Sequence, residues 1–114
     1  MPSRAYELFA EAIISGKQIL CSYEGRPRAL SPIILGHKDG QEKALTYQFG
    51  GYSSKGLPPE GQWRCLFLSK VTNVRLRDGP QLAGDSHKQP QGCVDIVDLD
   101  VNPESPYNPR RRVR

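Results

Sequence analysis

The sequence predicts a mainly β fold, a small five-stranded barrel or curled sheet with one N-terminal helix. Two observations predict it. Segments in which apolar and polar residues alternate recur through residues 18–76, which is typical of strands with one buried face. Turn residues that include Gly separate most of these segments, as in a chain of hairpins. With 114 residues, the chain suffices for one domain and a tail.

The predicted helix lies near the N-terminus, where Ser3 can cap its first turn and Gly16 can end it. Glu7 favours the first turn because a negative charge stabilises the N-terminal end of a helix. The apolar residues of this segment recur at spacings of three and four, which places them on one face: Ala5, Leu8, Phe9, Ala12 and Ile13.

Five strands are predicted, at Gln18–Tyr23, Arg28–Leu35, Lys43–Gln48, Gln62–Leu68 and Val71–Leu76. Glu24-Gly25 predicts a tight turn after the first strand, and Asp39-Gly40 predicts one after the second. Pro32 has no amide hydrogen to donate, so it predicts either an edge position or a bulge in the second strand.

Composition changes after Arg77. We therefore predict a barrel domain at residues 1–77, followed at 78–114 by a linker and an Arg-rich tail. Between them, Cys93–Val101 is either a short edge strand or an extended segment laid against a neighbour. Residues 1–77 have eleven Lys and Arg against six Asp and Glu (+5), whereas residues 78–109 have one Lys against six acids (−5). The acidic segment can compete with a polyanion for the basic domain or serve only to solvate the tail, and we favour solvation.

The three cysteines, Cys21, Cys65 and Cys93, show no close pair and no metal-type spacing. Cys21 and Cys65 lie within apolar runs, which predicts buried free thiols. The chain has no secretory signal and no apolar stretch approaching 18 residues. Together these features predict a soluble, cytoplasmic protein with reduced cysteines and no membrane partner.

A long segment rich in Gly, Ser and Pro, Gly50–Gly61, separates the third strand from the fourth. Loops of this length in compact domains are uncommon and are often functional, so we interpret it as the rim of a binding site. The alternative is a mobile hairpin connection with no role.

A family resemblance rests on the order of several residues. The first hairpin reads Tyr23-x-Gly25-x-x-Arg28-x-x-x-Pro32, and the fourth strand reads Trp63-Arg64-Cys65-Leu66-Phe67-Leu68. Tyr47-Gln48, Gly50-Gly51, Ser53, Gly56 and Pro59 stand between them. In this order the residues resemble the WYL domain, a bacterial module that senses ligands and nucleic acids, and more closely its short single-domain members.

The resemblance covers residues 12–76 and implies an Sm/SH3-like barrel with a role in transcription regulation. Two positions depart from the family pattern. Lys43-Ala44-Leu45 keeps only the Leu of the tripeptide that names the family, and Phe67 stands where relatives often carry Arg. Larger relatives also carry a DNA-binding helical domain, which a single short helix cannot supply.

Arg28 is the leading candidate for ligand binding, because a guanidinium can donate two parallel hydrogen bonds to a phosphate or carboxylate. The alternative is an exposed cation paired with Glu24 or Glu42. Further candidates are aromatic rings that can stack on a base, neutral hydrogen-bonding groups, and surrounding cations: Tyr23, Tyr47, Gln48, Ser53, Ser54, Lys43 and Arg64. The hypothesis requires Arg28 and Tyr47 to share one side of the sheet.

The sequence predicts no catalysis, because His37 and His87 have no partner at a recognisable spacing, and it predicts no cofactor and no metal. The preferred hypothesis is a regulatory module that binds a nucleotide or a single-stranded nucleic acid and acts on a partner protein. A second hypothesis is an assembly module that forms a dimer or ring, with the C-terminal tail as a docking arm. A third is non-specific nucleic-acid binding by Arg110–Arg114 alone.

Overall fold

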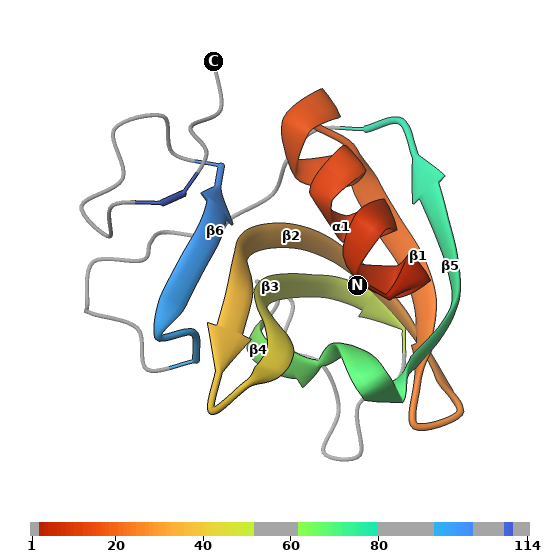
Figure 1. Ribbon diagram of the computed structural model, residues 1–114. Helices are drawn as coiled ribbons and strands as arrows, with labels where there is room; N and C mark the ends of the chain where they lie inside the picture. Colours follow the sequence, from red (N-terminus) through yellow and green to blue (C-terminus); the bar gives the residue numbers. More distant parts are fainter. Residues whose placement is uncertain (1–2, 52–61, 80–92, 102–108, 111–114) are drawn as a thin grey trace.

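The computed structural model describes residues 3–51, 62–79, 93–101 and 109–110. Figure 1 shows one helix packed on an antiparallel sheet. The elements are α1 (Arg4–Ser15), β1 (Gln18–Tyr23), β2 (Arg26–Lys38), β3 (Gln41–Gly51), β4 (Gln62–Phe67), a 3₁₀ turn η1 (Leu68–Lys70), β5 (Val71–Arg77) and β6 (Ile96–Asp100). None of the helices in these ranges is long and apolar enough to cross a membrane.

The sheet has six strands in the order β4-β3-β2-β1-β5, and β6 pairs with β2 beside this path. The long strand β2 changes neighbours along its length. Its first half pairs with β1, where Leu30 lies opposite Ile19, and its second half pairs with β6, where Ile34 lies opposite Asp100. The predicted mainly β fold with a leading helix is confirmed, and the segment predicted as an edge strand or an extended segment supplies β6.

The predicted caps and turns are confirmed. The Ser3 side chain accepts a hydrogen bond from the Tyr6 amide at 3.2 Å, and Gly16 ends α1 in the left-handed region at φ 70°. The two short hairpins place both turn residues at positive φ, as a two-residue turn of the I′ type requires. These residues are Glu24 (52°), Gly25 (82°), Asp39 (53°) and Gly40 (78°).

Pro32 lies between the half of β2 that pairs with β1 and the half that pairs with β6. The ladder between β2 and β3 shifts register between Pro32 and Ile34, so the predicted bulge is confirmed. The strand as a whole is not an edge strand, but Pro32 itself pairs only with Thr46 of β3, because the β1 ladder ends at Leu30 and the β6 ladder begins at Ile34.

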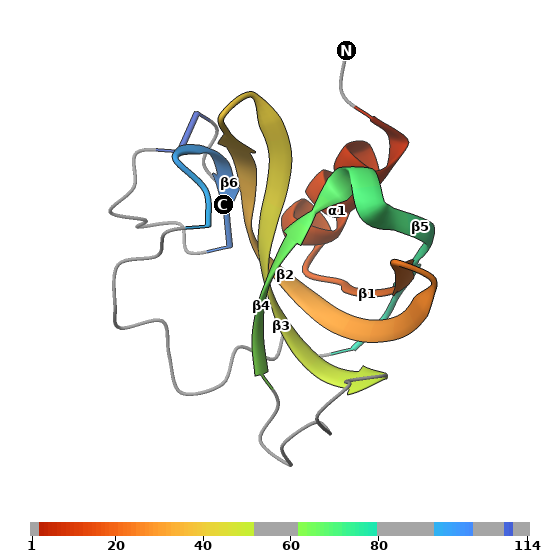
Figure 2. The same ribbon diagram turned by 90° about the horizontal axis from the view of Figure 1, so that it is seen from below.

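The inner cluster fills the space between α1 and the sheet, which bends around the helix (Figure 2). Phe9, Ala12 and Ile13 of α1 are buried there, as the helical spacing predicts. Full burial of a side chain such as Phe9 contributes about 1.5 to 3 kcal/mol. The strands, η1 and β6 contribute the rest of this cluster: Ile19, Cys21, Tyr23, Leu30, Leu35, Ala44, Leu66, Leu68, Val71 and Leu99.

The outer cluster lies on the opposite face of the sheet. Its buried members come from β2, β3 and the C-terminal segment: Ile33, Ile34, Leu45, Tyr47, Cys93, Val94 and Val97. Phe49 and Trp63 pack against it. Four residues beyond Arg77 are therefore buried members of the two hydrophobic clusters, so the fold extends past the end of the predicted barrel domain: Cys93, Val94, Val97 and Leu99.

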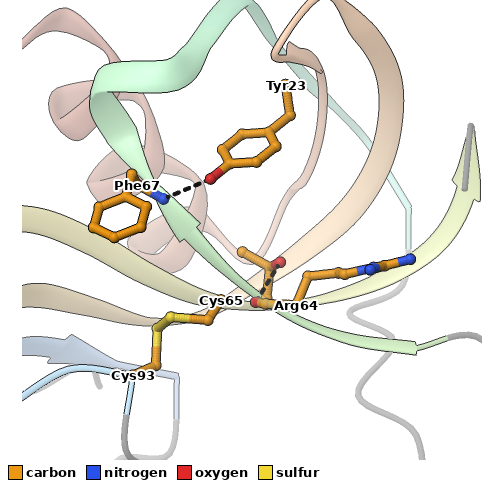
Figure 3. Close-up of a disulfide and its surroundings, with 6 residues drawn as sticks. Tyr23, Arg64, Cys65, Phe67 and Cys93 are labelled. Carbon is orange, nitrogen blue, oxygen red and sulfur yellow. Dashed lines mark hydrogen bonds between the residues drawn. A yellow bond between two sulfur atoms is a disulfide. The ribbon is translucent and has the colours of Figure 1, made fainter. Parts of the chain in front are cut away.

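Two of the three cysteines are joined. A disulfide links Cys65 on β4 to Cys93, which precedes β6 and is buried (Figure 3). The prediction that all cysteines are reduced is wrong, and Cys65 is an exposed residue rather than a buried thiol. Cys21 is free and buried, as predicted. Sequence spacing did not reveal the pair because the fold, not the chain, brings Cys65 and Cys93 together.

Candidate anion-binding site

Gln48 is the centre of a polar cluster on the inner face of the sheet. It is fully buried, and its backbone lies opposite Leu30 in the β2–β3 ladder. The side-chain oxygen Oε1 accepts hydrogen bonds from Arg28 Nη1 at 2.7 Å and from Arg64 Nε at 3.2 Å. Its Nε2 donates to the Gly50 carbonyl at 2.9 Å, which fixes the orientation of the amide. Two guanidinium groups thus converge on one neutral oxygen.

Arg28 has an unusual environment for a cation. Its Nε is buried and has no hydrogen-bond partner among the described residues. Burial lowers the pKa of Arg28, and the nearby charge of Arg64 lowers it further. Both effects arise because the site disfavours positive charge, so an anion bound there would relieve them.

The alternative in which Arg28 pairs with a neighbouring carboxylate is wrong within the described part of the chain. Glu24 lies 3.9 Å from the Nζ atom of Lys70. Glu42 accepts hydrogen bonds from the backbone and side chain of Ser3, at 3.0 and 2.5 Å. Arg28 therefore uses a neutral amide where an ordinary surface arginine uses an acid.

Tyr23 supplies the aromatic neighbour of this cluster. The Arg28 guanidinium carbon lies 5.7 Å from the centre of the Tyr23 ring, within the range of a cation–π contact. The Tyr23 hydroxyl accepts a hydrogen bond from the Phe67 amide at 3.1 Å (Figure 3). The backbone of Tyr23 lies in β1 and its hydroxyl is hydrogen-bonded to β4, so the position of the ring beside the guanidinium is fixed.

Tyr47 lies on the other face of β3. Successive side chains of a strand point to opposite faces, so Tyr47 and Gln48 diverge. Tyr47 is 6% exposed in the outer cluster, and its ring meets that of Trp63 edge-on with 5.4 Å between centroids. The site in which Arg28 and Tyr47 share one side of the sheet, which the hypothesis required, is therefore wrong. Tyr23 is the phenol beside Arg28, so any binding site at Arg28 has to be argued from Tyr23 instead.

The remaining predicted residues do not join the cluster in the described structure. Lys43 lies opposite Phe67 in the β3–β4 ladder, and its Nζ is 4.4 Å from the Phe67 ring centre. Ser53 and Ser54 lie outside the described residues, as does most of the predicted rim Gly50–Gly61. The structure thus brings together Tyr23, Arg28, Gln48 and Arg64.

Arg28 also lines a groove of about 540 Å³, whose lining does not include Tyr23, Gln48 or Arg64. Residues of β1, β2 and β5 line it, among them Ser22, Asn73 and Arg75. The β1–β5 ladder shifts register between Leu20 and Ser22, and Asn73 adopts φ 52° in this bulge. Such bulges redirect side chains and are frequent beside binding sites. Sequence reasoning missed Asn73, for which the signal is an Asn inside a predicted strand.

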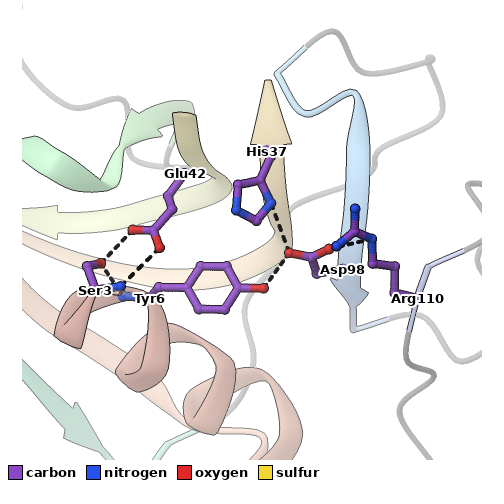
Figure 4. A network of polar contacts seen from close by, with 6 residues as sticks. All are labelled: Ser3, Tyr6, His37, Glu42, Asp98 and Arg110. Atoms are coloured by element: carbon purple, nitrogen blue, oxygen red, sulfur yellow. Dashed lines mark hydrogen bonds and ion pairs between the residues drawn. The ribbon is translucent and has the colours of Figure 1, made fainter. Parts of the chain in front are cut away.

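A second polar cluster was also missed by sequence reasoning (Figure 4). The Asp98 carboxylate on β6 accepts a hydrogen bond from the Tyr6 hydroxyl, and His37 Nδ1 lies 3.1 Å from the same oxygen. Arg110 Nε lies 3.3 Å from the other carboxylate oxygen. The prediction that His37 lies in a turn is wrong, because β2 extends to Lys38. Within the described ranges, no three His, Cys, Asp or Glu residues gather as metal ligands would.

No protein-family model matches the chain, and no curated protein or solved structure is significantly similar to it. The resemblance to WYL domains therefore stays a prediction. The candidate site is argued from its own geometry.

Proposed function

We propose that this protein is a non-catalytic module that binds an anionic ligand, a nucleotide or a short single-stranded nucleic acid, at Arg28, Gln48 and Arg64. One observation carries the proposal. Two guanidinium groups meet at the neutral Gln48 oxygen. A phosphate placed beside them would accept charge-assisted hydrogen bonds, which are stronger than those that a neutral amide provides.

The surroundings suit a ligand that is larger than a phosphate ion. Ligand sites commonly have volumes of about 300 to 1,000 Å³, and the groove beside Arg28 has about 540 Å³. Arg75 adds a second cation to its lining, and Asn73 and Ser22 add groups that can donate and accept hydrogen bonds. Tyr23 offers an aromatic ring next to the anchoring guanidinium.

A barrel of the Sm type, as in WYL domains, is the finer fold that accompanies this function. The connection between the outer strands of the sheet supports it. β4 and β5 stand at opposite ends of the strand order, yet the three residues of η1 join them directly. A sheet whose ends meet through so short a turn must curl strongly. A regulatory action on a partner protein belongs to the same proposal.

The alternative, an assembly module with the tail as a docking arm, has less support. β6 pairs with β2 of its own chain, and Cys93 is bonded to Cys65 of that chain. This part of the tail is therefore already engaged. A truncated chain that lacks residues 78–114 would not distinguish the two hypotheses, because the truncation also removes buried core residues.

The test is titration of the full chain with inorganic phosphate, adenosine monophosphate and a short oligothymidylate by calorimetry at low salt. Arg28→Gln should weaken binding of the preferred ligand about 10- to 100-fold, since a charged hydrogen bond contributes about 1.5 to 3 kcal/mol. Lys43→Gln is the matched control, because it removes a predicted site cation that lies over Phe67. Equal loss in both variants, or no binding of any anion, would reject the proposal.

A further inference from the structure

Cys93–Val101, which we call the strap, comprises β6 and the residues on either side of it, and β6 is a strand of the sheet beside the second half of β2. The strand pairs with the second half of β2, and two backbone bonds extend the pairing beyond the strand. The Asp95 amide donates to the His37 carbonyl at 3.0 Å, and the Val101 amide donates to the Ile33 carbonyl at 2.9 Å. Side chains of this segment fill the outer cluster: Cys93, Val94 and Val97.

The backbone of this segment approaches β2 at Gly36. A Cβ atom at that position would lie 1.9 Å from the Ile96 carbonyl oxygen and 2.5 Å from Val94 Cγ1. No larger residue fits there without displacing the C-terminal segment. The close approach of the strap to β2 at this position therefore requires glycine.

A polar contact holds the middle of the strap. Asp98 is 7% exposed and receives the Tyr6 hydroxyl and His37 Nδ1, with Arg110 at its other oxygen (Figure 4). The Arg110 amide also donates to the Val97 carbonyl at 3.0 Å. These contacts and the ladder are non-covalent, whereas the disulfide at Cys93 is the one covalent tie between the described strap and the sheet.

We propose that the Cys65–Cys93 disulfide is a redox latch, whose reduction lets the strap open and expose the outer cluster. The reductant is an external dithiol. Its thiolate attacks Sγ of Cys65, which is an exposed residue, and the bond to Cys93 breaks. Cys93 leaves as a thiolate that takes a proton from water. The second thiol of the reductant then displaces Cys65, so that one disulfide forms for each one reduced.

The expected size of the effect follows from loop entropy. The two cysteines are 28 residues apart, and the disulfide closes a loop of that length. Loss of such a constraint should raise the population of opened strap on the order of several hundred-fold. The ladder and the Asp98 contacts remain, so the strap opens transiently and does not unfold the sheet.

Hydrogen exchange of single amides tests the latch. The Cys21→Ala variant is used throughout because it removes the one free thiol among the described residues, leaving Cys65 and Cys93 as the described redox pair. After treatment with dithiothreitol, the amides of Asp95 and Val101 should exchange several hundred-fold faster. Amides in the β1–β5 ladder, such as that of Leu76, should change less than about threefold.

Trp63 is a second reporter, because it is the single tryptophan of the chain and packs against the outer cluster. Reduction should make its fluorescence more accessible to a soluble quencher. Gly36→Val should give the same quenching while the disulfide is intact, since it displaces the strap directly. Unchanged exchange at Asp95 and Val101 after reduction would overturn the proposal. So would equal acceleration at Leu76, because the disulfide would then support the whole fold.

Discussion

The two faces of strand β3 differ in both composition and cover. On the inner face, Thr46 and Gln48 lead from the hydrophobic core to a pair of arginines. On the outer face, Leu45 and Tyr47 lie in an apolar cluster to which Cys93, Val94 and Val97 also belong. One residue of sequence separates a candidate ligand-binding side chain from a packing side chain. On a strand, the face decides the role of a residue more than its neighbours in sequence do.

The largest expected difference between the faces is in how much of the fold loses stability when a buried side chain is truncated. Leu30 is fully buried in the inner cluster, so Leu30→Ala should lower the free energy of unfolding by about 2 to 5 kcal/mol. Val97→Ala in the outer cluster should cost about 2 kcal/mol and act mainly on the strap. Urea unfolding gives the totals, and hydrogen exchange at Val101 shows where the loss falls. Equal, global losses would remove the distinction between the faces.

The cysteines of the two faces differ in whether they titrate, and the dependence of stability on pH should show this difference. Burial raises the pKa of the Cys21 thiol from 9.0 to about 11, although the charge of Arg28 opposes the shift. Since the folded pKa exceeds the unfolded one, the stabilisation is complete below pH 9 and is lost as pH rises towards 11. The shift corresponds to about 2 to 3 kcal/mol. Cys65 and Cys93 do not titrate while they are bonded.

The measurement is urea unfolding of the wild type and of Cys21→Ala between pH 7 and 11. As pH rises above 9, the unfolding free energy of the wild type should fall relative to that of Cys21→Ala, because only the wild type has the buried thiol. A difference that stays constant across this range would show that the thiol is not desolvated in the fold.

The smallest effect is expected at a surface ion pair that belongs to neither face. Lys17 and Asp78 lie 2.9 Å apart, but their side chains are 40% and 92% exposed. Lys17→Gln should change the unfolding free energy by less than about 0.5 kcal/mol, because solvent screens an exposed pair. Thermal denaturation at low and high salt measures this. A loss comparable to that of Val97→Ala would mean that the pair organises the end of α1.

The sequence predicted four members of the candidate site, Tyr23, Arg28, Gln48 and Arg64, which the structure brings together. Their residue types and the hairpin order were sufficient for that. It also placed Tyr47 there, although Tyr47 and Gln48 are adjacent on one predicted strand and alternation allows only one of them to face Arg28. The β2–β3 ladder shifts register between Ala29 and Leu30, close to the site.

Other parts of the site and the strap depend on distant contacts. Asn73 enters the groove through a bulge in the β1–β5 ladder, and its local signal in the sequence is an Asn inside a predicted strand. Asp98 meets Tyr6 from 92 residues away. His37 looked isolated in sequence because its partner lies on β6.

The sequence by itself determined the helix, its caps and the hairpin turns, because Ser3, Gly16 and the Glu24-Gly25 and Asp39-Gly40 pairs act over a few residues. Only the tertiary structure decided that Cys65 bonds to Cys93 and that β6 pairs with β2. These choices join segments far apart in the chain, and their outcome depends on sheet register and on the entropy of closing long loops.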